Sequence, residues 1–352
     1  MLAGRNFMKT LSLCALGATI AIFPSPAPGA AGQQDNDGLI YNAYSSSIVP
    51  VPLAERDLQS VEAKFHKTIG NEGQTLEGAI FDAAGNLLFC NVSDRKVMRL
   101  SPDGELSMLL QLDDFSPGGL ALSPDGRLFV AAINQADRRG TVLALLPDGK
   151  SLETIIGPDA GYLPNDLVFD ANGGFYFSDF KGSATQPLGG VYYVAPDFRT
   201  ISPVIPQMAQ ANGVALSPDG RTLWATEYAR NLLHRVNLSG PAQVPLTGSK
   251  IPYRFIGPAP DSMRVDRDGN VYVAMVGQGR VLVFNPAGLP VAQILLPGRD
   301  KGLNLRSTSL ALHPARKEMR IVAGNTPEAS SGEAAIFAGP AFSRGLSPSA
   351  TK

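Results

Sequence analysis

Short stretches of alternating apolar and polar residues recur along the chain, and in each the alternation continues on both sides of a tight turn. The period of two is typical of half-buried β-strands, and the glycine in most of these turns supplies the positive φ that a two-strand connection needs. There are six copies, the last of them degraded: AIFDAAGNLLF (79–89), LALSPDGRLFV (120–130), LVFDANGGFYF (167–177), VALSPDGRTLW (214–224), DSMRVDRDGNVYV (261–273) and LALHPARKEMRIV (310–322).

The repeat has a nearly constant length. The residues that open the six turns follow one another at intervals of 41 to 49 residues: Asp82, Ser123, Asp170, Ser217, Asp266 and His313. A unit of this length accommodates one four-stranded blade, so six copies predict an all-β fold, a six-bladed β-propeller over residues 76–342. A chain of 352 residues could form two domains, but the unbroken repeat favours one.

Equivalent positions of successive blades lie on a ring around the propeller axis. Five residues before each turn-opening residue stand Glu77, Gly118, Asn165, Asn212, Asp261 and Thr308. Two are carboxylates and two are carboxamides, and Ser262 can add a hydroxyl. Oxygen donors of this kind suit Ca²⁺, whereas the absence of a Cys/His cluster disfavours zinc and copper. Taken singly, each residue could simply favour a turn; together they predict a central metal site.

The two ends of the chain differ from the repeat. Residues 1–31 combine Arg5 and Lys9 with the apolar run LSLCALGATIAIF (11–23) and a zone of small residues, which predicts a secretory signal peptide and an exported, periplasmic or secreted protein. A buried N-terminal helix is the alternative. No segment is long enough to span a membrane. Residues 32–75 are expected to lead into the propeller and to supply an outer strand, and residues 343–352 to form a loose tail.

Composition narrows the range of partners. The net charge is −1 and 17% of the residues are charged, which offers no face for nucleic acid. Without the signal peptide, Cys90 is the only cysteine, and it is expected to be a small core residue rather than a nucleophile. The three histidines fall at different phases of the repeat and are expected to be structural. A closed propeller has no free edge that demands a partner, so a monomer is expected.

Long stretches of the chain resemble one family. They are LPNDLVFDANGGFYFSDFKGSATQPLGGVYYVAPDFRT (163–200), IPYRFIGPAPDSMRVD (251–266), VYVAMVGQGRVLVFN (271–285) and ILLPGRDKGLNLRST (294–308). The chain resembles the senescence-marker-protein/gluconolactonase/regucalcin superfamily of six-bladed propellers, and within it the staphylococcal drug-responsive lactonases. The similarity extends from about residue 47 to residue 342.

The resemblance implies a Ca²⁺ ion in the central tunnel and hydrolysis of lactones, which are small-molecule substrates. It assigns the metal ligands to Glu77, Asn165, Asn212 and Asp261 with Ser262, and the proton-transfer carboxylate to Asp261. At the position of Asn165 the narrower lactonase group looks to carry Asp, whereas the wider superfamily carries Asn. The resemblance therefore implies that the site here has one carboxylate fewer than the site of the narrower group.

The resemblance to the narrower group also implies a second, structural calcium ion near the second blade. The matching region here, around Gly140 and residues 157–162, lacks the Ser, Thr and Asp side chains of that site. A single ion is therefore expected, although Asp159 lies nearby in the sequence.

The expected chemistry is attack on a polarised lactone carbonyl by water, with Asp261 moving the proton and Asp166 supporting Asn165. Direct attack by Asp261 is an open alternative. Two other functions also remain open: a gluconolactonase-like or other ester hydrolase on the same site, and a non-enzymatic binding propeller whose ion is structural.

Overall fold

Six sheets make up the fold in the part of the chain that the structure, a computed structural model, describes: residues 39–42, 45–146, 149–324 and 333–346. All six belong to the compact unit Asn42–Lys352. The signal peptide expected at residues 1–31 lies outside the described residues. Within the described ranges, no helix has the length and apolar character that a membrane span requires.

The first three sheets follow one another along the chain, each with four antiparallel strands. The first contains β3 (Leu76–Phe81), β4 (Leu87–Asn91), β5 (Lys96–Leu100) and β6 (Leu106–Gln111). The second contains β7 (Ser116–Leu122), β8 (Leu128–Asn134), β9 (Arg139–Leu145) and β10 (Leu152–Ile156). The third contains β11 (Pro164–Phe169), β12 (Phe175–Asp179), β15 (Gly189–Val194) and β16 (Ile201–Met208). A small surface hairpin, β13 (Gly182–Ser183) and β14 (Gln186–Pro187), interrupts the third.

The remaining three sheets complete the ring. The fourth contains β17 (Ala211–Leu216), β18 (Thr222–Glu227), β19 (Leu232–Asn237) and β20 (Ser249–Arg254). The fifth contains β21 (Pro260–Val265), β22 (Val271–Met275), β23 (Arg280–Phe284) and β24 (Pro290–Leu295). The sixth contains β25 (Arg306–Leu312), β26 (Glu318–Gly324) and β27 (Glu333–Pro340), and its fourth strand comes from the N-terminal segment.

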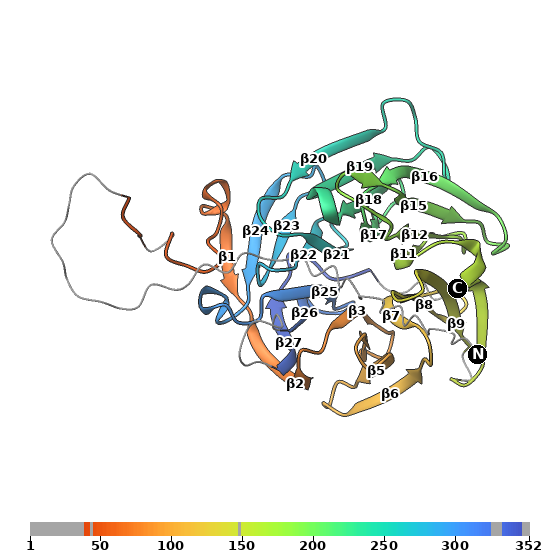
Figure 1. Cartoon of the computed structure of the whole chain (residues 1–352), viewed down its shortest axis with the longest axis horizontal. Coiled ribbons are helices and arrows are strands. Elements are labelled where there is room, and N and C mark those ends of the chain that lie inside the picture. The colour runs from red at the N-terminus through yellow and green to blue at the C-terminus, as the bar shows by residue number, and fades with distance from the viewer. Residues whose placement is uncertain (1–38, 43–44, 147–148, 325–332, 347–352) are drawn as a thin grey trace, which may run out of the picture. The chain divides into compact units, whose positions relative to one another are not determined.

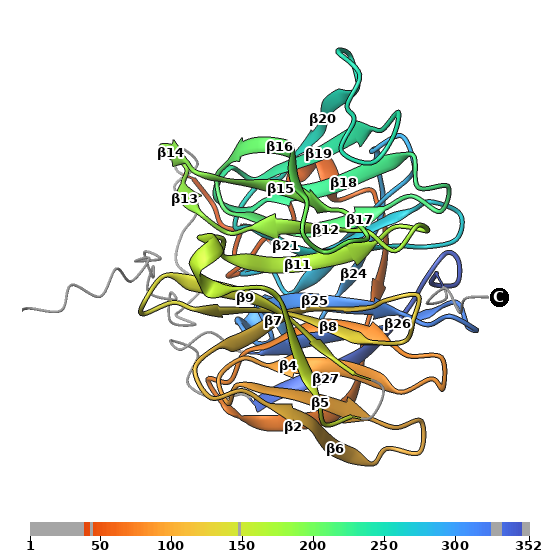
Figure 2. The ribbon, with the colours of Figure 1, turned by 90° about the vertical axis from the view of Figure 1, so that its right-hand side faces the viewer.

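The first strands of the sheets surround one axis. Each of β3, β7, β11, β17, β21 and β25 contacts the first strand of the sheet before it and of the sheet after it, and β25 contacts β3. Figure 1 shows these six strands nearest the centre of the ring, and Figure 2 shows β11 and β12 between strands of their two neighbouring sheets. The prediction of an all-β, six-bladed propeller is confirmed.

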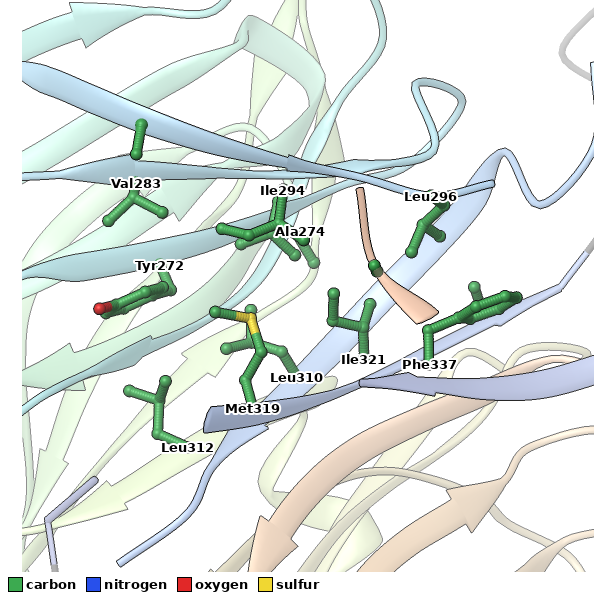
Figure 3. Packing of buried hydrophobic residues seen from close by; sticks show 14 of the residues in the cluster. Tyr272, Ala274, Val283, Ile294, Leu296, Leu310, Leu312, Met319, Ile321 and Phe337 are labelled. Carbon is green, nitrogen blue, oxygen red and sulfur yellow. The ribbon is translucent and has the colours of Figure 1, made fainter. Parts of the chain in front are cut away.

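Each pair of neighbouring blades encloses one hydrophobic cluster. The cluster between the fifth and sixth blades contains Tyr272, Ile294, Leu310, Met319 and Phe337, and Figure 3 shows these side chains among the strands of the two blades. Five further clusters fill the other interfaces between blades. Cys90 is fully buried in the cluster between the first two blades, as expected of a core residue. The apolar side chains are thus used between the blades, which leaves the positions on the axis to polar residues.

The N-terminal segment closes the ring. Strand β2 (Lys64–Glu72) pairs antiparallel with β27 as the outermost strand of the sixth blade, and β1 (Gln59–Glu62) pairs parallel with β24 of the fifth. The segment thus supplies two outer strands instead of the one that was expected. In the short 3₁₀ helix η1 (Leu53–Glu55), Glu55 is fully buried and its carboxylate lies 2.5 Å from the guanidinium of Arg280.

The C-terminal residues that the structure describes are held in place. Gly345 forms a β-bridge with Asp266 and donates a backbone hydrogen bond of 2.9 Å to the carbonyl of His313. The carbonyl of Arg344 accepts one of the same length from the N–H of Arg267. Residues 343–346 are therefore not the loose tail that the sequence suggested. Residues 347–352 lie outside the described part of the chain.

The buried pair of Glu55 and Arg280 predicts a cost for breaking it. We expect Glu55→Gln to lower the free energy of unfolding by about 3 kcal/mol, because an unpaired guanidinium then remains buried. Urea denaturation measures this value. The exposed Glu62→Gln is the matched control, with an expected change under about 0.5 kcal/mol, and Glu55→Gln with Arg280→Met should regain most of the loss. Equal effects of the two single variants would contradict the prediction.

Candidate functional site

Every innermost strand shifts its pairing register at the same point, and that point is the predicted ring. One extra residue interrupts the ladder between Glu77 and Ile80 in β3, and equivalent shifts occur in the other five strands. The ring residues lie inside or at the edge of these shifts. An extra residue re-aims the side chains around it, so each blade can turn a side chain out of the ladder and toward the axis. The common phase seen in the sequence therefore has a structural cause.

The strands approach so closely at this level that some neighbouring positions admit only glycine. A Cβ atom on Gly119 would lie 2.5 Å from the carbonyl oxygen of Asn165, and one on Gly213 would lie 2.6 Å from that of Asp261. Both distances are well inside van der Waals contact. The backbones of neighbouring blades therefore meet next to the ring, which fixes the positions of Asn165 and Asp261.

Asn212 and Asp261 form the buried centre of the site. Both side chains are almost fully buried, and the side-chain amide of Asn212 is hydrogen-bonded to the carboxylate of Asp261. The amide oxygen of Asn212 is also buried, and it has no hydrogen-bond partner among the described residues. A buried carbonyl oxygen without a donor is costly in a folded protein, unless a cation or a water molecule faces it.

The two carboxylates of the ring lie close enough to disturb each other. Burial and then the charges of Asp261 and Asp166 raise the pKa of Glu77 well above its usual range. Burial also raises the pKa of Asp261, to about 7, despite the hydrogen bond from Asn212. Negative charges gathered in a buried place favour protonation or a bound cation. A cation placed between Glu77 and Asp261 would lower the pKa values of both carboxyl groups.

The donor set fits a hard cation that binds oxygen. Among the described residues, no group of three or more His, Cys, Asp or Glu side chains is placed to hold a metal ion. The predicted set contains only two carboxylates, and its other oxygens come from Asn165, Asn212 and Ser262. Asn165 is half-buried, as is Glu77, whereas Ser262 is buried next to Asp261. Ca²⁺ accepts such mixed ligands and completes its shell with water.

The other two ring positions contribute no donor. Gly118 has no side chain, and the hydroxyl of Thr308 is used in a short hydrogen bond to the carbonyl of Leu76. This bond joins the sixth blade to the first, next to Glu77. The ring thus contains four donor-bearing positions, one position without a side chain, and one, Thr308, that links two blades.

Asp166 has a different role from the one expected. Its buried carboxylate accepts hydrogen bonds from the N–H of Leu167 at 3.0 Å and from the guanidinium of Arg264 at 3.0 Å, with a longer one from the N–H of Val214 at 3.4 Å. Arg264 also donates to the carbonyl of Ala79. No bond to the Asn165 side chain is found among the described residues. Asp166 and Arg264 instead tie four blades together across the axis.

The axis is hollow on the far side of this ion pair. A cavity of about 460 Å³ is lined by the second halves of all six innermost strands, with Arg264 among its lining residues and Leu346 near the C-terminal end. Apart from Arg264 and the turn residues, its walls are mostly aliphatic. The polar ring and this apolar cavity are therefore at opposite ends of the six strands.

Two buried carboxylates that the sequence analysis missed hold the backbone leading to the ring. Asp179 ends β12 and accepts a hydrogen bond of 2.8 Å from the N–H of Leu163, two residues before Asn165. Glu227 ends β18 and accepts one of 2.8 Å from the N–H of Ala209, three residues before Asn212. The signal was present in the repeat, because FYFSD (175–179) and LWATE (223–227) end on an acid at equivalent positions.

The analysis also missed two residues at the rim of the site. Tyr228 follows β18, and burial and then the charge of Asp261 raise the pKa of its phenol to about 12. Arg306 begins β25, and its positive charge acts on Glu77, Asp261 and Tyr228. No periodic signal marks either residue, since each occurs in one blade only.

The histidines are not part of the ring. The region around Gly140 and residues 157–162, which was compared with a second calcium site, is not part of it either. His234 lies 2.8 Å from Glu227, and His313 accepts hydrogen bonds from backbone N–H groups of its own turn. Asp159 forms a surface ion pair of 3.5 Å with Arg139. A Cβ on Gly140 would lie 2.5 Å from Pro164, so this position is closely packed.

Comparison with known proteins gives a consistent result. The model of the SMP-30/Gluconolactonase/LRE-like region matches residues 76–305. The lactonase drp35 of Staphylococcus haemolyticus is 43% identical over 312 residues, which cover 87% of this chain and 95% of that protein.

Two solved structures share the fold at lower identity. A calcium-binding regucalcin from Agrobacterium tumefaciens superposes with a TM-score of 0.65 at 17% identity, covering 82% of this chain and 98% of that one. A gluconolactonase from Xanthomonas campestris gives 0.62 at 18% identity, covering 80% and 96%. At this identity, these two structures bear on the fold alone.

The support that Glu227 gives to the ring can be tested through stability. We expect Glu227→Ala to lower the free energy of unfolding by about 2 kcal/mol, because the buried N–H of Ala209 loses its acceptor. The exposed Glu105→Ala should change it by less than about 0.5 kcal/mol. Thermal or urea denaturation of both variants measures the difference. If Glu227→Ala were as stable as Glu105→Ala, Glu227 would not hold this loop.

Proposed function

Since the chain belongs to the SMP-30/gluconolactonase/LRE-like family, as its family match and its 43%-identical relative show, we propose that it is a calcium-dependent lactonase. The substrate is a small lactone, and the reaction takes place at the ring of Glu77, Asn165, Asn212 and Asp261. The observation that carries this proposal is the buried, unpartnered oxygen of Asn212 beside the raised-pKa carboxylate of Asp261.

Five side chains would hold the calcium ion: Glu77, Asn165, Asn212, Asp261 and Ser262. Their charges sum to −2 when both acids are ionised, which matches a divalent cation. When bound, the ion supplies a positive charge that polarises a carbonyl group and stabilises negative charge on its oxygen. The residues of the chain position the substrate and move the proton.

Asp261 is the residue proposed to move the proton. Its carboxylate is buried at the ring, where burial raises its pKa to about 7 in the absence of a metal ion. A carboxylate in this position can take a proton from a water molecule and return one to a leaving alkoxide. In the proposed reaction a water molecule loses a proton to Asp261 and its oxygen bonds to the lactone carbonyl carbon. The ring C–O bond then breaks, and the proton passes from Asp261 to the departing alkoxide. One water molecule is consumed and one hydroxycarboxylic acid is formed.

We also propose that the protein is exported after removal of residues 1–31. The support is the charged start, the short apolar run and the small residues of that segment. Mass spectrometry of the protein recovered from the producing cells, in periplasmic and cytoplasmic fractions, tests this. An intact N-terminus in the cytoplasm would contradict it.

The activity and its dependence on the ion can be tested together in a pH-stat. We expect acid release from a small aromatic lactone or a sugar lactone with Ca²⁺ present, its loss after chelation with EGTA, and its return when Ca²⁺ is restored. The faster substrate separates an aryl lactonase from a gluconolactonase-like enzyme. If a folded protein released no acid from either lactone in any of these states, the enzymatic proposal would fail and a binding propeller would be favoured.

The role of Asp261 predicts a large loss on substitution. We expect Asp261→Asn to lower kcat by about 10²-fold to 10⁴-fold, the range typical of a lost acid–base group, while the fold survives. Asp268→Asn, in the turn that follows β21, is the matched control and should leave kcat unchanged. Far-ultraviolet circular dichroism confirms folding, and initial rates at saturating Ca²⁺ give kcat. A normal rate in Asp261→Asn would remove Asp261 from the mechanism.

Binding of the ion has a consequence for stability that does not require turnover. At about 100 times its dissociation constant, Ca²⁺ should raise the free energy of unfolding by about 2.7 kcal/mol. Glu77→Gln should reduce this gain, because it removes one of the two ligand charges. Thermal denaturation with Ca²⁺ and with EGTA measures the gain for each protein. An identical gain in wild type and Glu77→Gln would exclude Glu77 from the metal site.

A further inference from the structure

Arg306 stands at the end of β25 that lies with the ring residues, and its backbone is tightly fixed. The N–H groups of Gly277 and Gly279 both donate to the carbonyl of Leu305, at 2.8 and 3.1 Å. Arg306 itself pairs with Gly324 in the same sheet and forms a bridge with Val276 of the preceding blade. The start of the Arg306 side chain is therefore held at a defined place on the rim of the site.

The charge of Arg306 faces the two ring carboxylates without pairing with either. Its side chain is half-buried, and none of the ion pairs among the described residues includes it. Its positive charge nevertheless lowers the pKa values of Glu77 and Asp261. The guanidinium is thus within electrostatic reach of the two carboxylates, and its N–H groups make no hydrogen bond or ion pair among the described residues.

Arg264, the other arginine near the axis, is not equivalent to Arg306. Its guanidinium is bonded to Asp166 and to two backbone carbonyls, those of Ala79 and Met263. These contacts use most of its donors within the protein. Arg306 is consequently the arginine on the axis whose donors remain available on the side of the ring, within the part of the chain that the structure describes.

Tyr228 lies on the same rim and supplies a neutral donor. Its N–H donates to the carbonyl of Gln210 at 3.0 Å, and its ring packs edge-on against Phe180 with centroids 5.7 Å apart. The nearby charges that act on its phenol are those of Asp261, Arg306 and Glu77. A tyrosine hydroxyl is protonated at neutral pH, so it can donate a hydrogen bond to a ligand.

We propose that Arg306 and Tyr228 form the substrate-binding side of the site, where Arg306 binds the carboxylate that lactone opening creates and Tyr228 donates to an oxygen of the same ligand. This inference rests on the proposed lactonase function and specifies how the protein holds its ligands, the hydroxycarboxylates and their lactones. A guanidinium holds a carboxylate through parallel, charge-assisted hydrogen bonds. The carboxyl end of the bound ligand therefore lies at Arg306.

Binding of a product without turnover provides the test. Isothermal titration calorimetry on the Ca²⁺-loaded protein would compare 5-hydroxypentanoate with the neutral 1,5-pentanediol, which has the same number of carbon atoms and no carboxylate. We expect wild type to prefer the hydroxy acid. We expect Arg306→Gln to weaken its binding about 10-fold to 100-fold, the size of one charge-assisted hydrogen bond, and to leave diol binding unchanged. Tyr228→Phe should weaken both ligands by a smaller factor.

Two further variants separate a binding role from a structural one. Arg306→Lys retains the positive charge and should recover part of the affinity for 5-hydroxypentanoate. Arg138→Gln removes an exposed arginine from the loop between β8 and β9 and should change nothing. Thermal denaturation of each variant shows whether it is folded.

The outcomes distinguish this inference from the proposed function. If wild type hydrolyses δ-valerolactone but a folded Arg306→Gln binds 5-hydroxypentanoate as tightly as wild type, the inference is wrong and the lactonase proposal stands. If wild type shows no preference for the hydroxy acid over the diol, the inference is also wrong. If wild type hydrolyses no lactone at all, the proposed function fails first.

Discussion

The site depends on one constraint, the register shift that interrupts all six innermost strands at the same level. A regular strand would alternate its side chains between the two blade interfaces, and both interfaces are filled by apolar clusters. The extra residue breaks this alternation and lets Glu77, Asn212 and Asp261 leave the interfaces for the axis. Close packing beside the shifts, as at Gly119 and Gly213, then leaves little freedom to the backbone that carries these side chains.

The charged residues along the axis lie at two levels that have different roles. At one level the negative charge of Asp166 is neutralised by Arg264 and by backbone N–H groups, and the result is a structural link between blades. At the next level, none of the ion pairs among the described residues includes Glu77 or Asp261, and burial raises the pKa values of both carboxyl groups. A protein that retains two buried carboxylates without an ion-pair partner maintains a costly arrangement, which is typical of a functional site. The side-chain oxygen of Asn212, which has no hydrogen-bond partner among the described residues, lies at the same level.

Stability comes from elsewhere in the molecule. The six clusters between blades provide the apolar burial, and the N-terminal segment closes the ring by adding β2 to the last blade. The buried pair of Glu55 and Arg280 secures that segment to the fifth blade. Because these interactions lie away from the axis, the ring residues can be arranged for chemistry and not for packing. Their substitution is accordingly expected to affect activity more than folding.

The sequence by itself determined the fold and the membership of the ring. Strand alternation and glycine turns are local properties, and their repetition at 41 to 49 residues required a radial arrangement that brings Glu77, Asn165, Asn212 and Asp261 to one axis.

Only the tertiary structure decided the contacts that occur in a single blade and are not repeated in the others. Asp166 shares its strand with Asn165 yet is bonded to Arg264 from another blade. Arg306, at the start of β25, and Tyr228, directly after β18, reach the rim at positions that no repeat marks. The second N-terminal strand, β1, and the fixed residues 343–346 likewise depend on contacts between distant segments. Periodicity reports what all blades share, whereas contacts between blades depend on side chains that are far apart in the chain.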